Sequence, residues 1–248
     1  MENAYVTYHN SYIESIWAIL KQVWDKQLIY LGHKVVPYCY RCGTALSSHE
    51  VAQGYQNLWD DSVYVKFRLK EQKDTYILAW TTTPWTLPGN VALAVGKSID
   101  YVKVQVGEEI WVLAKDLADR VVTQEHKVVA EIKGQDLVGL AYEPLFDIPA
   151  LRSDKSYKIY PADFVTTEDG TGIVHTAVMY GEDDYELGTK VGLPKWHTVD
   201  ETGHFTADVP ELAGAAVKHK ETDKRIFEYL KERNLLLKIE KYQHEYPH

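Results

Sequence analysis

The stretch Thr75-Tyr-Ile-Leu-Ala-Trp-Thr-Thr-Thr-Pro-Trp-Thr-Leu-Pro-Gly-Asn90 changes character half-way along. Its first residues include β-branched and aromatic side chains, which predicts a strand. Three threonines end that strand, and Pro84 and Pro88, which have no backbone N–H to donate, then force the chain out of the sheet. Threonine is also an ordinary strand residue, and for an isolated Thr-Thr pair that explanation would suffice. For the whole string from Trp80 to Asn90, we expect hydroxyls that serve a ligand or a water.

The sequence around this stretch predicts many short strands. Ser62–Leu69 alternates as a half-buried strand would, and Thr75–Trp80 is its expected partner. Turns separate the other candidates, which favours a closed or nearly closed β-barrel over a series of βαβ units. These further strands are expected at Val91–Val95, Asp100–Val106, Ile110–Ala114, Val128–Lys133, Phe164–Thr166, Gly172–His175 and His197–Val199.

Helices are expected at three places. Near the start, Ser11 and Glu14 have the spacing of a capping box. The apolar residues that follow lie on one helical face: Ile13, Ile16, Trp17, Leu20, Val23 and Trp24. A short helix is expected over about 182–190, and another over about 223–233 that buries Ile226, Phe227 and Leu230.

Composition limits the class of protein. The 248 residues are 45% hydrophobic, enough for a sizeable core, and no apolar run approaches the roughly 20 residues of a membrane span. The start lacks the features of a signal peptide, so we expect a cytoplasmic protein. The net charge of -9 argues against strong nonspecific binding of nucleic acid. Between 218 and 241, however, eight lysines and arginines face five acids, which fits either a solvated helix or a phosphate-facing edge.

A second polar segment runs from Asp169-Gly-Thr-Gly-Ile-Val to His175 and on to Asp184. Gly170 and Gly172 allow a tight turn into a strand that carries His175. Acids are favoured in the first turn of a helix by its dipole, so Asp184 could be a simple capping residue. A single histidine on an apolar strand is likewise more often structural than functional.

The two cysteines form a Cys39-Tyr-Arg-Cys42 motif. A structural zinc site needs four ligands, and this motif supplies two. The remaining ligands would have to come from His33, His49 or His248; otherwise the motif is half of a zinc site.

Three segments together resemble one family. The string Trp80–Asn90 closely resembles the threonine-rich peptide in the editing domain of isoleucyl-tRNA synthetases. The valyl and leucyl relatives usually have arginine after two threonines, whereas this chain has Thr83. The segment with His175 and Asp184 is similar to the second editing segment of that family, and the cysteine motif looks like its zinc-ribbon entry. The resemblance extends from about Tyr8 to His248.

The resemblance implies a mostly β fold with helices, namely a β-barrel editing domain of the valyl/isoleucyl/leucyl type. It implies a connecting helix and half a zinc ribbon in 1–60, the barrel core in 61–217, and a helix with a return strand in 218–248. It also implies hydrolysis of valine attached to tRNA(Ile), and of valyl-adenylate, without aminoacylation by this piece. The expected partners are the tRNA 3′ end and the rest of the synthetase, with no membrane.

The same resemblance assigns residue roles. Thr82 and Thr83 would position water or the oxyanion, and Asp184 would bind the substrate ammonium. His175 would be the size gate. The other expected substrate-binding residues are Trp80, Thr81, Trp85, Thr86 and Asn90. Cys39 and Cys42 would be a half site without zinc here, with Zn²⁺ expected only in the full-length enzyme and no cofactor in this chain.

Two features separate this chain from its expected relatives. The signatures His-x-Gly-His and Lys-Met-Ser-Lys-Ser of the synthetic site are missing from the sequence, so ATP chemistry is not expected. Where the family commonly has Ala-Pro-Ala, the chain has Ala177-Val178-Met179, which affects the pocket wall. Two rival functions remain: a noncatalytic tRNA-docking or amino-acid-binding module, and a valyl-type editor that acts on threonine.

Overall fold

The computed structural model describes residues 5–247. The chain divides into two compact units, Met1–Lys34 and Val35–His248. The expectations about the first residues and about His248 as a zinc ligand lie outside the described residues. No helix within the described part is long and apolar enough to cross a membrane, and the cytoplasmic location stays a prediction.

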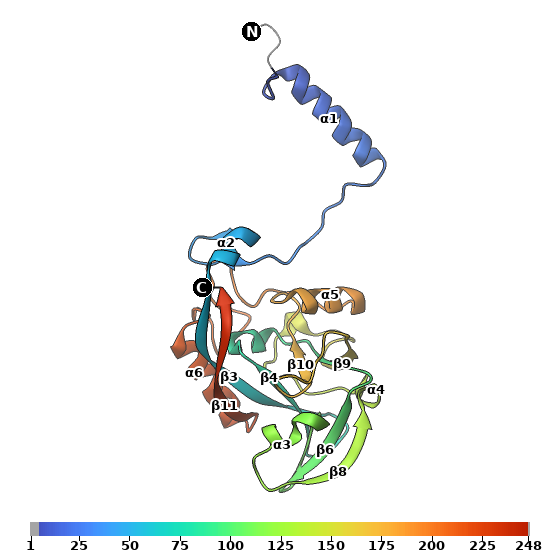
Figure 1. The fold of residues 1–248 in the computed structure, drawn as a ribbon, viewed down its shortest axis with the longest axis vertical. Helices are drawn as coiled ribbons and strands as arrows, with labels where there is room; N and C mark the ends of the chain where they lie inside the picture. Colours follow the sequence, from blue (N-terminus) through green and yellow to red (C-terminus); the bar gives the residue numbers. More distant parts are fainter. Residues whose placement is uncertain (1–4, 248) are drawn as a thin grey trace. The chain divides into compact units, whose positions relative to one another are not determined.

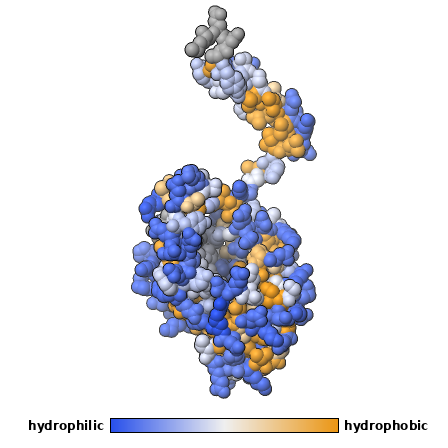
Figure 2. Space-filling view, in the orientation of Figure 1, coloured by the Kyte–Doolittle hydropathy of each residue, from blue (hydrophilic) through white to orange (hydrophobic). Residues whose placement is uncertain are grey.

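The smaller unit contains one helix, α1 (Asn10–Asp25). The apolar stripe is present but none of its residues is buried, and Trp17 remains 67% exposed. This stripe appears as the apolar patch on the helix in Figure 2. The predicted capping box is wrong, because the helix begins before Ser11 with His9 as its N-cap. Ser11 lies inside the helix, where its carbonyl accepts a hydrogen bond from Ser15 Oγ at 2.7 Å.

The larger unit is built on a six-stranded sheet with the order β11-β3-β4-β7-β6-β8 (Figure 1). Strands β4 and β7 pair in parallel, and the other neighbours are antiparallel. The strands expected around 62–69, 75–80, 100–106, 110–114 and 128–133 are confirmed. Their bounds are β3 Tyr55–Arg68, β4 Thr75–Thr81, β6 Asp100–Val106, β7 Glu109–Ala114, β8 Lys127–Lys133 and β11 Leu236–Pro247.

A second sheet of the larger unit has three strands in the order β10-β5-β9. It consists of β5 (Ala92–Val95), β9 (Lys158–Pro161) and β10 (Ile173–Thr176). Strand β10 packs against β4, but the two strands belong to different sheets and do not pair. The strands therefore do not form one continuous ring, and the expected closed barrel is wrong. Strand β4 ends at Thr81, and Pro84 and Pro88, which have no N–H to donate, lie in a short 3-10 helix that leads the chain to β5 in the other sheet. Both sheets nevertheless share one core, which includes Phe67 and Leu93.

Two expected strands are also wrong. Phe164–Thr166 lies in a loop, and His197–Val199 contributes only a single bridge from Val199 to Phe205. The apolar side chain of Val165 packs into a small cluster with Ala94 and Leu187. Burial, rather than strand pairing, therefore explains this apolar pattern.

Strand β3 is more buried than its alternation predicts. Every residue from Val63 to Phe67 is buried, including Lys66, which is 4% exposed. Lys66 Nζ pairs with Glu109 Oε2 at 2.8 Å, and its backbone N–H donates to Leu235 O at 2.8 Å. The rings of Tyr76 and Trp111 lie 4.9 and 5.7 Å from Lys66 Nζ on the face expected to meet solvent, and the ion pair with Glu109 compensates the buried charge.

The C-terminal helix and return strand are present as expected. Helix α6 (Lys220–Glu232) buries Ile226 and Leu230, while Phe227 is only partly buried. Strand β11 follows β3 along nearly its whole length (Figure 1). Because β3 runs unbroken through residue 60, the expected division at 60/61 falls inside a strand, and the three-part division stays a prediction.

The remaining elements are short except for α5, which was expected. Their bounds are β1 Tyr38–Cys39, β2 Thr44–Ala45, α2 Ser48–Gln53, η1 Pro84–Gly89, η2 Lys115–Leu117, α3 Ala118–Val121, α4 Gly134–Leu137, η3 Pro149–Leu151 and α5 Glu182–Val191.

Candidate functional site

The threonine-rich peptide forms a compact hydroxyl cluster at the end of β4. Pro84 occupies the first turn of η1, where its fixed φ suits a helix start and its missing N–H costs nothing. Thr83 O accepts from Thr86 N at 3.0 Å and from Thr86 Oγ1 at 2.8 Å. Thr83 N donates to Thr81 Oγ1 at 3.1 Å, and the hydroxyls of these two threonines are 3.2 Å apart. Thr82 and Thr83 are half-buried, so part of the cluster reaches the surface.

His175 joins this cluster from the other sheet. It lies on β10 opposite Leu93 of β5 and is 7% exposed. Its Nε2 is 2.8 Å from Thr86 Oγ1, and its Nδ1 is 3.4 Å from Asn90 Nδ2. Burial lowers the pKa of His175 to about 4, because the charged ring would lose its hydration. The ring is therefore neutral at pH 7.

Asn90 is held inside the protein by its own set of contacts. It is 4% exposed, and its Nδ2 donates to Ala92 O at 2.9 Å. Its Oδ1 accepts from the hydroxyl of Tyr142, a fully buried residue, at 2.7 Å. The sequence does not indicate a role for Tyr142, because it belongs to none of the recognised motifs or predicted elements. Asn90 as a substrate contact stays a prediction.

Asp184 lies in the first turn of α5, which begins after Gly181. Its Oδ2 accepts a long hydrogen bond of 3.4 Å from Ala177 N. A Cβ on Gly181 would lie 2.9 Å from the same oxygen, so only glycine leaves room for this carboxylate. Burial raises the pKa of Asp184 to about 7, while the Ala177 N–H lowers it by less. A bound cation would favour the ionised form.

The segment 177–180 connects the two motifs. The rings of Trp85 and Tyr180 meet edge to face at 5.1 Å. A Cβ on Gly89 would lie 2.8 Å from Tyr180 Cε2 and 3.6 Å from Ala177 Cβ, so η1 packs directly against this segment. The structure thus brings the threonine peptide, His175 and the segment before α5 together, and the roles expected of these residues stay predictions. Val178, the departure from the expected pattern, is buried against Gly188 of α5.

Trp80 points away from this cluster. It alternates with Thr81 on β4, and neighbouring strand residues face opposite sides. Its ring packs 5.0 Å from Tyr242 and 6.2 Å from Tyr64, and it lines a hollow of about 270 Å³ with Gly170. Trp80 as a substrate contact stays a prediction.

The cysteine motif forms a tight turn between β1 and β2. Cys42 N donates to Cys39 Sγ at 3.4 Å, and this contact lowers the pKa of the Cys39 thiol. Within residues 5–247, no group of three or more His, Cys, Asp or Glu side chains is placed to hold a metal ion. These two thiols are too few for a closed zinc site, and the partial zinc ribbon stays a prediction.

Comparison with known proteins identifies the family. The family described as tRNA synthetases class I (I, L, M and V) matches residues 1–176. The chain belongs to this family. It is 53% identical to the isoleucine--tRNA ligase of Clostridium tetani and 54% identical to that of Clostridium novyi, over 100% of this chain and 24% of each relative.

This class I chain therefore spans about a quarter of the length of the curated relatives it matches. Its fold is similar to the crystal structure of GlLeuRS-CP1, with a TM-score of 0.56 over 72% of this chain and 99% of that chain. The sequence identity of that pair is 15%, so the likeness concerns the fold alone. The hydroxyl cluster and His175 lie where the two sheets of this fold meet.

Proposed function

We propose that the chain is the editing domain of an isoleucyl-tRNA synthetase and hydrolyses the ester between valine and tRNA(Ile). The observation that carries this proposal is the contact of His175 Nε2 with Thr86 Oγ1 of the threonine peptide at 2.8 Å. The carboxylate of Asp184 accepts from the N–H of Ala177, two residues after His175 in the chain. Membership of the class I family and the similarity to isoleucine--tRNA ligases support it. The proposal makes the tRNA 3′ end and the rest of the synthetase its partners, and valyl-adenylate a further substrate.

A separate hydrolytic site has a physical purpose. A pocket that accepts isoleucine cannot strongly exclude valine, because one methylene is worth only about 1–3 kcal/mol, a general figure for this enzyme class rather than one obtained from this chain. A second site solves the problem when it admits valine and excludes isoleucine by size. His175 is well suited to set that size, since it is buried and held at both ring nitrogens.

The reaction needs an anchor, an attacking water and a stabilised oxyanion. Asp184 would anchor the α-ammonium of the substrate through a charge-assisted hydrogen bond. Binding of that cation would lower the Asp184 pKa from about 7 and keep the carboxylate ionised. Thr82 and Thr83, which are half-buried at the cluster edge, would position the water or the developing oxyanion.

The test is deacylation of tRNA(Ile) charged with valine, threonine or isoleucine. We expect the valyl ester to be hydrolysed faster than the other two. The chain is assayed alone and also in place of the corresponding segment of the Clostridium tetani relative, because docking of tRNA could need the rest of the enzyme.

Each alternative predicts a different result. Preference for the threonyl ester would indicate a valyl-type editor. Binding of a valyl-adenosine analogue without hydrolysis in either form would indicate a noncatalytic module, and both results would overturn the proposal.

A further inference from the structure

A chain of hydrogen bonds runs from a fully buried tyrosine to the threonine peptide, and chemistry fixes its direction. Ala92 O is a carbonyl and can only accept, so the Asn90 atom 2.9 Å away must be the amide nitrogen. The other Asn90 atom is therefore the oxygen, and it accepts from Tyr142 OH at 2.7 Å. Asn90 Nδ2 also lies 3.4 Å from His175 Nδ1, and because an amide nitrogen can only donate, Nδ1 is the acceptor of this contact.

The direction continues through the imidazole ring. Because Asn90 donates to Nδ1, that nitrogen carries a lone pair, and a neutral ring must hold its proton on Nε2. Nε2–H then donates to Thr86 Oγ1 at 2.8 Å. The Thr86 hydroxyl in turn donates to Thr83 O at 2.8 Å. Each group in the chain has one role that is consistent with its neighbours.

The geometry points to Asn90, anchored by Tyr142, as a positioning residue that holds His175 in the neutral Nε2–H tautomer. In this state neither ring nitrogen is free to take a proton from water, because one donates to Thr86 and the other accepts from Asn90. His175 therefore acts as a wall and as a support for Thr86 and Thr83, and not as a general base. The meaning for catalysis rests on the proposed function, whereas the tautomer itself does not.

The surroundings support this assignment. Asn90, Tyr142 and His175 are all buried, and the low pKa of His175, about 4, comes from burial. The ring thus stays neutral throughout the pH range in which an ester hydrolase of this kind would work.

The experiment is side-chain ¹⁵N NMR of His175 in the whole chain at about pH 7.5, well above the pKa of the buried ring. An unprotonated ring nitrogen resonates far downfield of a protonated one, so the spectrum reports the tautomer without any substrate. We expect Nδ1 to be unprotonated and Nε2 to be protonated. Asn90→Asp replaces the amide donor with an acceptor, so the proton should move to Nδ1 and the His175 pKa should rise by about 1–3.

Three further variants complete the test. Asn90→Ala, which removes the donor without adding charge, should give averaged shifts for the two ring nitrogens, and it serves if Asn90→Asp does not fold. Tyr142→Phe should shift the ring nitrogens in the same direction by a smaller amount. Tyr101→Phe is the matched control, because it removes another fully buried hydroxyl, which donates to Gly172 O at 2.7 Å, and should leave the tautomer unchanged.

Some outcomes would overturn the inference whether or not the chain deacylates tRNA. One is a proton on Nδ1 in the parent. Another is a tautomer that does not change in a folded Asn90→Asp or Asn90→Ala variant. Conversely, the expected spectra together with an inactive chain would leave the tautomer assignment standing and would count only against the proposed function.

Discussion

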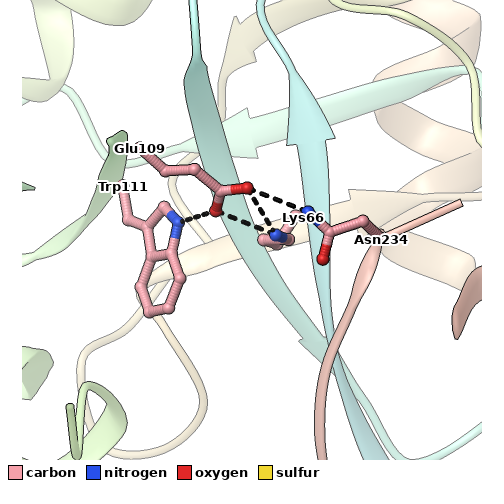
Figure 3. A network of polar contacts seen from close by, with 4 residues as sticks. All are labelled: Lys66, Glu109, Trp111 and Asn234. Carbon is pink, nitrogen blue, oxygen red and sulfur yellow. Dashed lines mark hydrogen bonds and ion pairs between the residues drawn. The ribbon is translucent and has the colours of Figure 1, made fainter. Parts of the chain in front are cut away.

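Two polar networks lie inside the larger unit, and they differ in charge. One joins Lys66 to Glu109, whose carboxylate also accepts from Trp111 Nε1 at 2.6 Å and Asn234 Nδ2 at 3.0 Å (Figure 3). The other runs through Tyr142, Asn90, His175 and Thr86 and carries no charge at pH 7. The charged network lies away from the threonine peptide, whereas the neutral one ends in it.

The difference indicates separate roles. Figure 3 shows side chains from β3, β7 and the turn before β11 that meet at the Glu109 carboxylate. This carboxylate therefore connects two strands of the large sheet with the turn that precedes β11. A neutral network instead keeps its donors and acceptors in fixed directions as the pH changes. Such constancy suits a site that must position a water and a substrate.

The largest expected effect tests the charged network. Glu109→Ala leaves Lys66 buried without its anion and removes the acceptor of Trp111 and Asn234. Loss of one partner of a buried pair typically costs about 3–5 kcal/mol. We expect the lower end in urea unfolding, because Lys66 Nζ also lies 4.9 Å from the centre of the Tyr76 ring.

The control for this prediction is an exposed ion pair. Glu131→Ala breaks the ion pair with Lys115. The side chains of Glu131 and Lys115 are 58% and 48% exposed, so the variant should lose less than about 1 kcal/mol of unfolding free energy. Equal losses in the two variants would show that the buried pair has no special structural role. The His175 tautomer should be the same in both variants as in the parent.

Some residues of these two networks were predictable from the sequence, and others were not. The strands flanking the threonine peptide were predictable, because alternation and the two prolines act locally. His175 and Asp184 were singled out only through the resemblance of their segment to the editing domain of isoleucyl-tRNA synthetases. Tyr142 was not found, since its contact with Asn90 joins positions 52 residues apart and leaves no local pattern. By alternation Lys66 falls on the strand face expected to meet solvent, but residues of neighbouring strands cover it: Glu109 Oε2 lies 2.8 Å from its Nζ, and the rings of Tyr76 and Trp111 lie 4.9 and 5.7 Å from it.

The errors have the same origin. Phe164–Thr166 has the composition of a strand but lies in a loop, where Val165 packs beside Leu187. The closed barrel was inferred from the number of strands, which does not determine how sheets join. Composition alone does not determine burial, since Trp17 is 67% exposed and Lys66 only 4% exposed, and hydrogen-bond partners depend on long-range packing.

A smaller effect is expected outside the neutral network, at Asp184. Asp184→Asn should weaken binding of a nonhydrolysable valyl-adenosine analogue by about 1.5–3 kcal/mol, the value of a charge-assisted hydrogen bond. The parent affinity should rise from about pH 5.5 to 7.5, because the Asp184 pKa of about 7 means that deprotonation creates the anion in this range. Calorimetry at several pH values would measure both effects.

The matched control is the neighbouring acid. Asp183 is exposed in the same helical turn, and its charge contributes to the raised pKa of Asp184. Asp183→Asn should therefore keep the affinity at pH 7.5 and move the pH profile slightly to lower pH. A flat profile in the parent, or an affinity unchanged in Asp184→Asn, would remove Asp184 from the role of ammonium partner.

The smallest effect concerns selectivity and tests the neutral network at its centre. His175→Ala opens space where the extra methylene of isoleucine would otherwise overpack, and relief of such overpacking is worth roughly 1–3 kcal/mol. The variant should begin to hydrolyse the isoleucyl ester, so the ratio of valine to isoleucine deacylation should fall. The ratio is decisive, because loss of the support for Thr86 would slow both reactions together. His126→Ala, which removes a ring bonded to Gln124 O at the surface, is the control and should leave the ratio unchanged. If His175→Ala lowers both rates and keeps the ratio, the ring is a support for the threonine peptide alone, and the size limit lies elsewhere in the wall, with Val178 and Met179 the next residues to change.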